Sequence, residues 1–139
     1  MFETLIYPKV AEPDFLQVNG RLVSIPLTAK GVAKFTFNDL CEKKLSAIDY
    51  ITICKNYHTV FIYNIPILKL SERDSLRRFI TLIDELYQHK VKLICSAEES
   101  PEKLFLNETT SDYDEVFSFD RTVSRLNEMQ TKLYLQNDY

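Results

Sequence analysis

A helical pattern between two short apolar segments is the feature that most constrains the fold. Residues Thr59–Ile65 (TVFIYNI) and Val91–Ala97 (VKLICSA) are apolar runs of strand length without regular alternation. Between them, apolar residues recur at helical spacing, at Leu76, Phe79, Ile80, Ile83, Leu86 and Tyr87. Strands without alternation are typical of parallel sheets, because both faces of such sheets are buried. The order strand, helix, strand therefore predicts a parallel βαβ core and an α/β fold.

The segment before this core predicts a small β element. Asn19-Gly20 is a preferred pair for a two-residue type I′ turn, and it lies between two segments that favour strands. Ala33–Phe37 (AKFTF) alternates and predicts a third strand. Residues 14–38 are therefore expected to form a β-hairpin region, and residues 46–106 to hold the βαβ core.

Serine residues mark the expected starts of three helices. Ser46 with Asp49, and Ser71 with Asp74, have the spacing of a capping box, in which each side chain bonds to the backbone near the other. Ser100 followed by Pro101 predicts a short helix with serine as its N-cap and proline in the first helical position.

The last part of the chain consists of a polar, acidic segment followed by a segment with apolar residues at helical spacing. Residues 107–115 (NETTSDYDE) predict an acidic loop, and residues 116–139 a C-terminal strand and helix. The strand is expected over Val116–Phe119, and Asp120 is the expected N-cap of a helix over Arg121–Gln136. The whole chain, residues 1–139, is expected to be a single α/β domain.

The charge and the apolar pattern exclude two classes of partner. The net charge is −3 and the pI about 5.4, which argues against a general nucleic-acid binder, since such a protein neutralises several phosphates with clustered lysine and arginine. The most apolar run, VFIYNIPIL, is too short to span a bilayer. The N-terminus has acids and a proline too early for a signal peptide. We expect a cytoplasmic chain with no transmembrane segment and no nucleic-acid partner.

The cysteines and histidines do not form a recognisable metal or redox motif. Three cysteines, Cys41, Cys54 and Cys95, are widely spaced, and none belongs to a C-x-x-C motif. No disulfide framework and no metal site are expected. Cys95 is expected to point into the sheet and to act as an inert apolar residue. Ser96 has no nucleophile motif around it, and nothing brings His58 or His89 to it, so no catalytic residue is predicted.

Two polar residues end the apolar runs, and they are the candidates for a small-ligand site. Asn64 and Ser96 stand where α/β sheets place ligands, at the carboxyl ends of the expected parallel strands. An amide is a poor Mg²⁺ ligand compared with a carboxylate, so Asn64 argues against a metal here.

Two motifs carry a family resemblance. Arg77 to Tyr87 (RRFITLIDELY) and Arg121 to Gln130 (RTVSRLNEMQ) resemble the C-terminal region of the ZapE and AFG-type, or lactation-elevated-like, P-loop ATPases, as do residues 34–51 and 56–66. The resemblance covers roughly Gly31 to Leu135. It implies an AAA-like ATPase that uses ATP and Mg²⁺, linked to the cell-division ring in bacteria and to protein turnover in mitochondria. The core is expected to be P-loop-NTPase-like or a degenerate Rossmann-like sheet, by descent or by convergence.

The residues that would hold ATP in that family have no counterpart here. The chain has two glycines, Gly20 and Gly31, and no G-x-x-x-x-G-K-[ST] segment, whose backbone N–H groups would bind phosphate. No cofactor is therefore expected in this chain, and alone it is predicted not to hydrolyse ATP. The resemblance implies two partners, the N-terminal P-loop half and a protein client. It also implies a mitochondrial location if the parent is eukaryotic.

Charged residues of the two motifs are the candidates for docking that half. Arg77 and Arg78 follow Asp74 by about one turn, so they predict either an ion-paired helix surface or an anchor for phosphate or a partner. Arg121, Arg125 and Glu128 fall on one helical stripe, together with Lys132, opposite the apolar side chains of the same helix. That stripe is either a solvated face or a docking face, for which guanidinium groups are well suited.

Three functions remain open from the sequence. The first is a docking or regulatory module of a ZapE- or AFG-type ATPase, without catalysis of its own. The second is a self-standing small-ligand enzyme with its site near Asn64 and Ser96. The third is an inactive remnant of a split ATPase gene.

Overall fold

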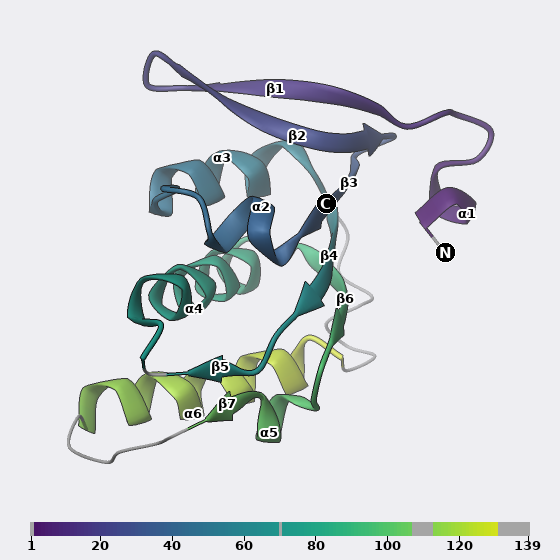
Figure 1. The fold of residues 1–139 in the computed structure, drawn as a ribbon. Coiled ribbons are helices and arrows are strands. Elements are labelled where there is room, and N and C mark those ends of the chain that lie inside the picture. Colours follow the sequence, from purple (N-terminus) through teal and green to yellow (C-terminus); the bar gives the residue numbers. More distant parts are fainter. Residues whose placement is uncertain (1, 70, 107–112, 131–139) are drawn as a thin grey trace.

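The computed structural model describes residues 2–69, 71–106 and 113–130, and it confirms an α/β fold built on a five-stranded sheet (Figure 1). The strand order is β1-β2-β3-β4-β6, and β5 and β7 form a second, two-stranded sheet. The strands are β1 (Glu12–Val18), β2 (Arg21–Ala29), β3 (Val32–Thr36), β4 (Thr59–Ile65), β5 (Leu68–Lys69), β6 (Lys92–Ala97) and β7 (Phe105–Leu106). The helices are α1 (Phe2–Ile6), α2 (Phe37–Cys41), α3 (Ala47–Asn56), α4 (Arg73–Gln88), α5 (Pro101–Leu104) and α6 (Tyr113–Glu128).

The N-terminal half of the sheet is the predicted hairpin. Asn19 and Gly20 both have positive φ, 48° and 81°, as a type I′ turn requires, and β1 pairs antiparallel with β2 on either side of them. The third strand, β3, ends at Thr36, one residue before the predicted end. Thr36 caps α2 instead: its backbone N–H donates to the Asp39 carboxylate at 2.9 Å and its Oγ accepts from the Asp39 N–H.

The C-terminal half of the sheet is parallel, as predicted for the βαβ core. β3 pairs with β4 and β4 with β6, both in parallel. Helices α2, α3 and α4 all lie on one side of these strands, and α1 lies on the other (Figure 1). Each parallel strand in the order β3, β4, β6 follows the previous one on the same side. Right-handed crossovers that all proceed in one direction along a sheet place their helices on the same face, which accounts for this arrangement. The opposite face holds a smaller cluster, in which Phe2 and Ile6 of α1 pack on Val32 and Phe61.

A buried carboxylate ties the hairpin to α3. Asp49 is fully buried in the first turn of α3, where its Oδ2 accepts from the Ser46 N–H at 2.7 Å, so the predicted capping box is confirmed. Nη2 of Arg21, next to the hairpin turn, lies 2.7 Å from each oxygen of this carboxylate. The Arg21 side chain is 47% exposed, so water reaches the cation while the anion is enclosed. The ion pair thus holds the tip of the hairpin on the helix layer.

The start of α4 differs from the prediction. Its N-cap is Glu72 rather than Ser71, and no side chain bonds to the cap, so the predicted Ser71–Asp74 capping box is wrong. The Glu72 N–H bonds to the carbonyl of Lys69 at 3.0 Å, in a turn that follows the pairing of β5 with β7. This tertiary pairing sets where the chain can enter the helix. By contrast, Ser100 and Pro101 begin α5 as predicted.

The last helix begins earlier than predicted. Val116–Phe119 and Asp120 lie inside α6, so neither the short strand nor the Asp120 N-cap is present. Residues 113–115 of the predicted acidic loop are also helical. The helix ends at Glu128 with Met129 and Gln130 in a turn, so the predicted continuation through these two residues is wrong. Residues 107–112 and the predicted end at Gln136 lie outside the described residues. The reason for the earlier start is burial at helical spacing, which continues through Phe119, Thr122, Leu126 and Met129. Phe119 stacks on Phe105 with ring centroids 4.9 Å apart, and this contact outweighs local strand preference.

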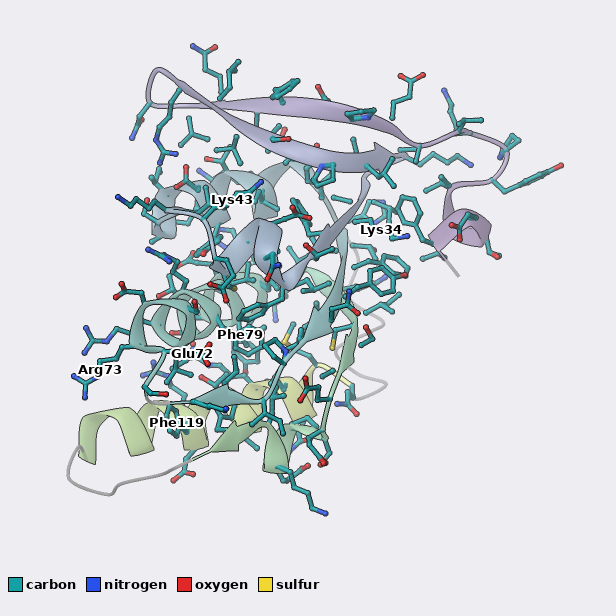
Figure 2. The ribbon with its side chains drawn as sticks, viewed as in Figure 1. Lys34, Lys43, Glu72, Arg73, Phe79 and Phe119 are labelled. Atoms are coloured by element: carbon teal, nitrogen blue, oxygen red, sulfur yellow. The ribbon has the colours of Figure 1, made fainter. Side chains whose placement is uncertain are left out.

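Phe79 is the centre of the main core. Its side chain is fully buried and lies between α4 and the sheet (Figure 2). Its ring lies 6.0 Å from that of Phe37 in α2 and 6.3 Å from that of Phe105 in β7. Through Phe105 the aromatic contacts continue to Phe119 in α6. One side chain therefore joins the helix layer to the lower part of the molecule.

We expect Phe79→Ala to lower the free energy of unfolding by about 3–5 kcal/mol, through lost apolar burial and the cavity left behind. A domain of this size has a total stability of about 5–15 kcal/mol, so the variant should melt far earlier or fail to fold. Urea denaturation followed by circular dichroism measures the change. Phe15→Ala is the matched control, because Phe15 is 58% exposed on β1 and its loss should change stability little. Equal midpoints for the two variants would contradict the central place of Phe79.

We expect Arg21→Ala to lower the free energy of unfolding by about 1–3 kcal/mol, because the buried Asp49 carboxylate would lose its counter-ion. The exposure of Arg21 keeps the expected loss below that of a fully enclosed pair. Lys44→Ala removes an exposed cation two residues before Ser46 and should stay within about 0.5 kcal/mol of the wild type. The measurement is the same urea titration. An Arg21→Ala midpoint indistinguishable from that of Lys44→Ala would show that the pair does not hold the hairpin.

Candidate functional site

The structure brings Asn64 and Ser96 together at the carboxyl ends of β4 and β6. Ser96 Oγ accepts a hydrogen bond from the Asn64 backbone N–H at 3.1 Å. Asn64 has φ 61°, and the pairing of β4 with β6 shifts register between Ile62 and Ile65. Asparagine adopts this left-handed conformation more readily than most residues, and the serine hydroxyl satisfies the N–H that the irregularity leaves unpaired. The bond gives the pair a structural role, and a ligand site there stays a prediction.

A cavity lies beside these strand ends, on the sheet face that carries α4. Its volume is about 220 Å³. Its walls are mainly apolar and come from β4, β6, α4, α5 and the C-terminal end of α6. The polar residues that line it are Glu99 and Gln130. The other lining residues are Ile65, Phe79, Leu93, Cys95, Ala97, Pro101, Leu104, Leu126 and Met129. Sequence reasoning missed this cavity, because its walls are far apart in the chain. The one local signal was the apolar spacing in α6, to which Leu126 belongs.

Cys95 is placed differently from the prediction. It is exposed rather than buried in the sheet, and it lines this cavity. The reason is that β6 is the last strand in the order of the described sheet, so its end has a neighbour on one side alone. Burial against the cavity wall still raises the pKa of the Cys95 thiol. A raised pKa leaves less thiolate at neutral pH.

Arg77 and Arg78 have different environments on α4. Arg78 is half-buried and its guanidinium donates to the carbonyl of Cys41 at 3.2 Å, at the C-terminal end of α2. Ser75 donates to the Glu42 carboxylate at 2.9 Å beside it. Both bonds hold α2 on α4, where a cation also complements the negative end of a helix. Arg77 is exposed on the same helix.

The two motifs noted in the sequence meet across α4 and α6. Asp84 of the first motif accepts hydrogen bonds from Arg125 and, at 3.2 Å, from Arg121 of the second. The Arg125 guanidinium also lies over the ring of Tyr87, 4.9 Å from its centroid. A hydrogen bond to the Glu128 carboxylate raises the pKa of Tyr87. We call this group of Asp84, Tyr87, Arg121, Arg125 and Glu128 the α4–α6 seam.

The seam has an enclosed part and an open part. Side-chain exposure is 22% for Arg125 and 25% for Asp84, but 51% for Arg121. Arg125 therefore does not belong to a fully solvated face, which was one of the two interpretations of the stripe. It lies between the helices because the seam is the edge along which α6 packs on α4. Whether Arg121 and its neighbours also bind a partner stays a prediction.

The hydrogen bonds of the seam join α4 to α6 and leave Arg121 half-exposed. Among the described residues there is no group of three or more histidine, cysteine or acidic side chains that could hold a metal ion. None of the helices in the described ranges is both long and apolar enough to cross a membrane.

Comparison with known proteins identifies relatives of the whole chain. The model of the AFG1-like ATPase family matches residues 1–138. Lactation elevated protein 1 homolog B of Danio rerio is 37% identical, over 96% of this chain and 32% of its own length. Cell division protein ZapE of Escherichia coli (strain K12) is 34% identical, over 89% of this chain and 32% of its own length.

No solved structure matches the chain. The chain spans about a third of the length of the curated relatives it matches. The family match nevertheless extends over nearly every residue, and it includes both motifs of the α4–α6 seam. On this evidence the chain belongs to the AFG1-like ATPase family.

Proposed function

We propose that this chain is a docking or regulatory module of an AFG1-like ATPase, which packs on the nucleotide-hydrolysing module and helps to hold a protein client. The observation that supports it most is the α4–α6 seam, in which the two motifs noted in the sequence bind each other and leave Arg121 half-exposed. The sequence has no P-loop, and the match covers about a third of each relative. ATP and Mg²⁺ would be bound by the other module.

Arg121 is the residue of the seam best placed to reach a partner. A guanidinium has five N–H donors, and the hydrogen bond from Arg121 to Asp84 at 3.2 Å engages one part of that group. Its half-exposed fork suits a carboxylate on a neighbouring domain. The packing of helices that positions Arg121 would depend on Arg125, Glu128 and Arg78. Arg77 would lie at the edge of the docking surface.

The wider cellular role that we propose is based on the names of the relatives. One relative carries a cell-division name, so the client of this chain would be a cell-division protein or a protein under quality control. The chain would act in the bacterial cytoplasm, or in mitochondria if the parent is eukaryotic. A small-ligand enzyme at Asn64 and Ser96 has less support, because the hydrogen bond between these residues already has a structural reason.

We expect Arg121→Ala to weaken binding of the ATPase module without changing the stability of this chain. The partner in the assay is the part of the E. coli relative that the match leaves out, and its own ATP hydrolysis shows that it is folded. Loss of a charged hydrogen bond should weaken the binding isotherm by about 1–3 kcal/mol, and the free energy of unfolding should change by less than about 0.5 kcal/mol. Arg125→Ala, by contrast, should lower the free energy of unfolding by about 1–3 kcal/mol, because it loses the Asp84 bond and the contact with Tyr87.

Three controls decide between the functions. The chain alone should release no phosphate from ATP, since it lacks the groups that position ATP and Mg²⁺. Steady release that Asn64→Ala or Ser96→Ala abolishes would replace the docking module with an enzyme. If the folded ATPase module does not bind the wild-type chain, the docking proposal is wrong and a remnant becomes the better account.

A further inference from the structure

The cavity beside the strand ends has no part in the α4–α6 seam, and its walls are mainly apolar. It opens at the carboxyl ends of parallel strands, where Ile65 of β4 and Ala97 of β6 lie. In α/β sheets this edge is the usual place for a bound group. Position alone does not identify the group, but the walls and the mouth of the cavity do.

The walls select for an apolar group of limited size. Phe79, Leu104, Leu126 and Met129 supply aliphatic, aromatic and thioether surface to the cavity. Its volume of about 220 Å³ is below the range of about 300–1,000 Å³ that drug-sized ligands and cofactors occupy. It is larger than a 150 Å³ cavity of the kind that holds a benzene molecule. One large side chain, such as that of phenylalanine, leucine or methionine, would fill it.

The carboxylates around the opening of the cavity favour a positively charged ligand. Glu99 lines the cavity and is exposed on the connection between β6 and α5. Glu102 of α5 stands close by and accepts a hydrogen bond from Asn127 of α6 at 2.9 Å. Carboxylates around an apolar cavity attract a cation and repel an anion. The bound group would therefore carry lysine or arginine next to its apolar side chain.

We propose that this cavity binds a large apolar side chain flanked by basic residues in a segment of a partner protein. The proposal rests on the proposed docking function and deepens it, because it states what kind of client segment the module would hold. A protein segment fits better than a small molecule, since the cavity takes a single side chain while the carboxylates lie outside it. Such an anchor residue in a pocket is the usual source of specificity in peptide recognition.

The test is a titration of the full chain, labelled with ¹⁵N, with short capped peptides. The probe is lysine–phenylalanine–lysine, compared with peptides that carry alanine in the centre or glutamate on both sides. We expect saturable shifts at residues that line the cavity, among them Cys95, Ala97 and Met129. Replacing phenylalanine by alanine should weaken binding at least about tenfold, as the loss of one buried aromatic side chain would. Glutamate flanks should weaken binding further.

Two substitutions locate the site. Ala97→Leu should fill the cavity and remove peptide binding, while the chain stays folded. Glu99→Gln should weaken binding several-fold, whereas Glu98→Gln, one residue away but outside the cavity, should do much less. If Ala97→Leu does not fold, the pair of glutamate variants still decides the matter, because neither changes the packing.

The outcomes separate this proposal from the docking function. Unchanged binding in both Ala97→Leu and Glu99→Gln, or shifts confined to another surface, would overturn the proposal. Benzyl alcohol that binds as tightly as the basic peptide would overturn it too, in favour of a small-molecule site. Binding of the ATPase module should survive Ala97→Leu. If the module binds and the peptide does not, only the cavity proposal fails, and the reverse result rejects docking at the seam alone.

Discussion

The burial of one amphipathic helix, α4, is the interaction on which the rest of the structure depends. Its apolar stripe, with Phe79 at the centre, closes the main core against the sheet. Its polar edges hold the other helices: Arg78 binds the end of α2, and Asp84 binds Arg121 and Arg125 of α6. Since apolar area removed from water supplies most of the folding free energy, the polar bonds chiefly set where the neighbouring helices lie.

The direction of the sheet explains why the strand ends and the cavity lie at one end of the molecule. β3, β4 and β6 are parallel, so their carboxyl ends share one edge, and the helices that connect them lie on one face. Beyond these strand ends, β5, α5, β7 and α6 form the lower part of the molecule (Figure 1). The cavity lies between α5, α6, α4 and the ends of β4 and β6. Residues of α6 therefore contribute both to the seam, through Arg121 and Arg125, and to the cavity, through Leu126.

Local signals predicted the elements that short-range physics determines, and tertiary contacts decided the rest. The turn at Asn19-Gly20, the cap at Ser46 and the bounds of β4 were all accessible, because φ preference, capping and continuous apolarity act within a few residues. The start of α6 was not, because Phe119 is buried by Phe105 from another element. The pairing of Asp84 with Arg125 was not accessible either, although complementary charge in the two motifs was a hint. The cavity needed the positions of five separate elements, which no local pattern contains.

A double-mutant cycle between Asp84 and Arg125 tests most directly whether the two motifs stabilise each other. The free energy of unfolding is measured for Asp84→Ala, Arg125→Ala and the double variant, with a parallel cycle of Arg125→Ala and Lys44→Ala as the control. We expect a coupling energy of about 1–3 kcal/mol for the first cycle, since the pair is charged and largely enclosed, and additivity for the second. A coupling below about 0.5 kcal/mol in the first cycle would show that the motifs merely lie next to each other, and it would contradict the seam as the structural basis of the family motifs.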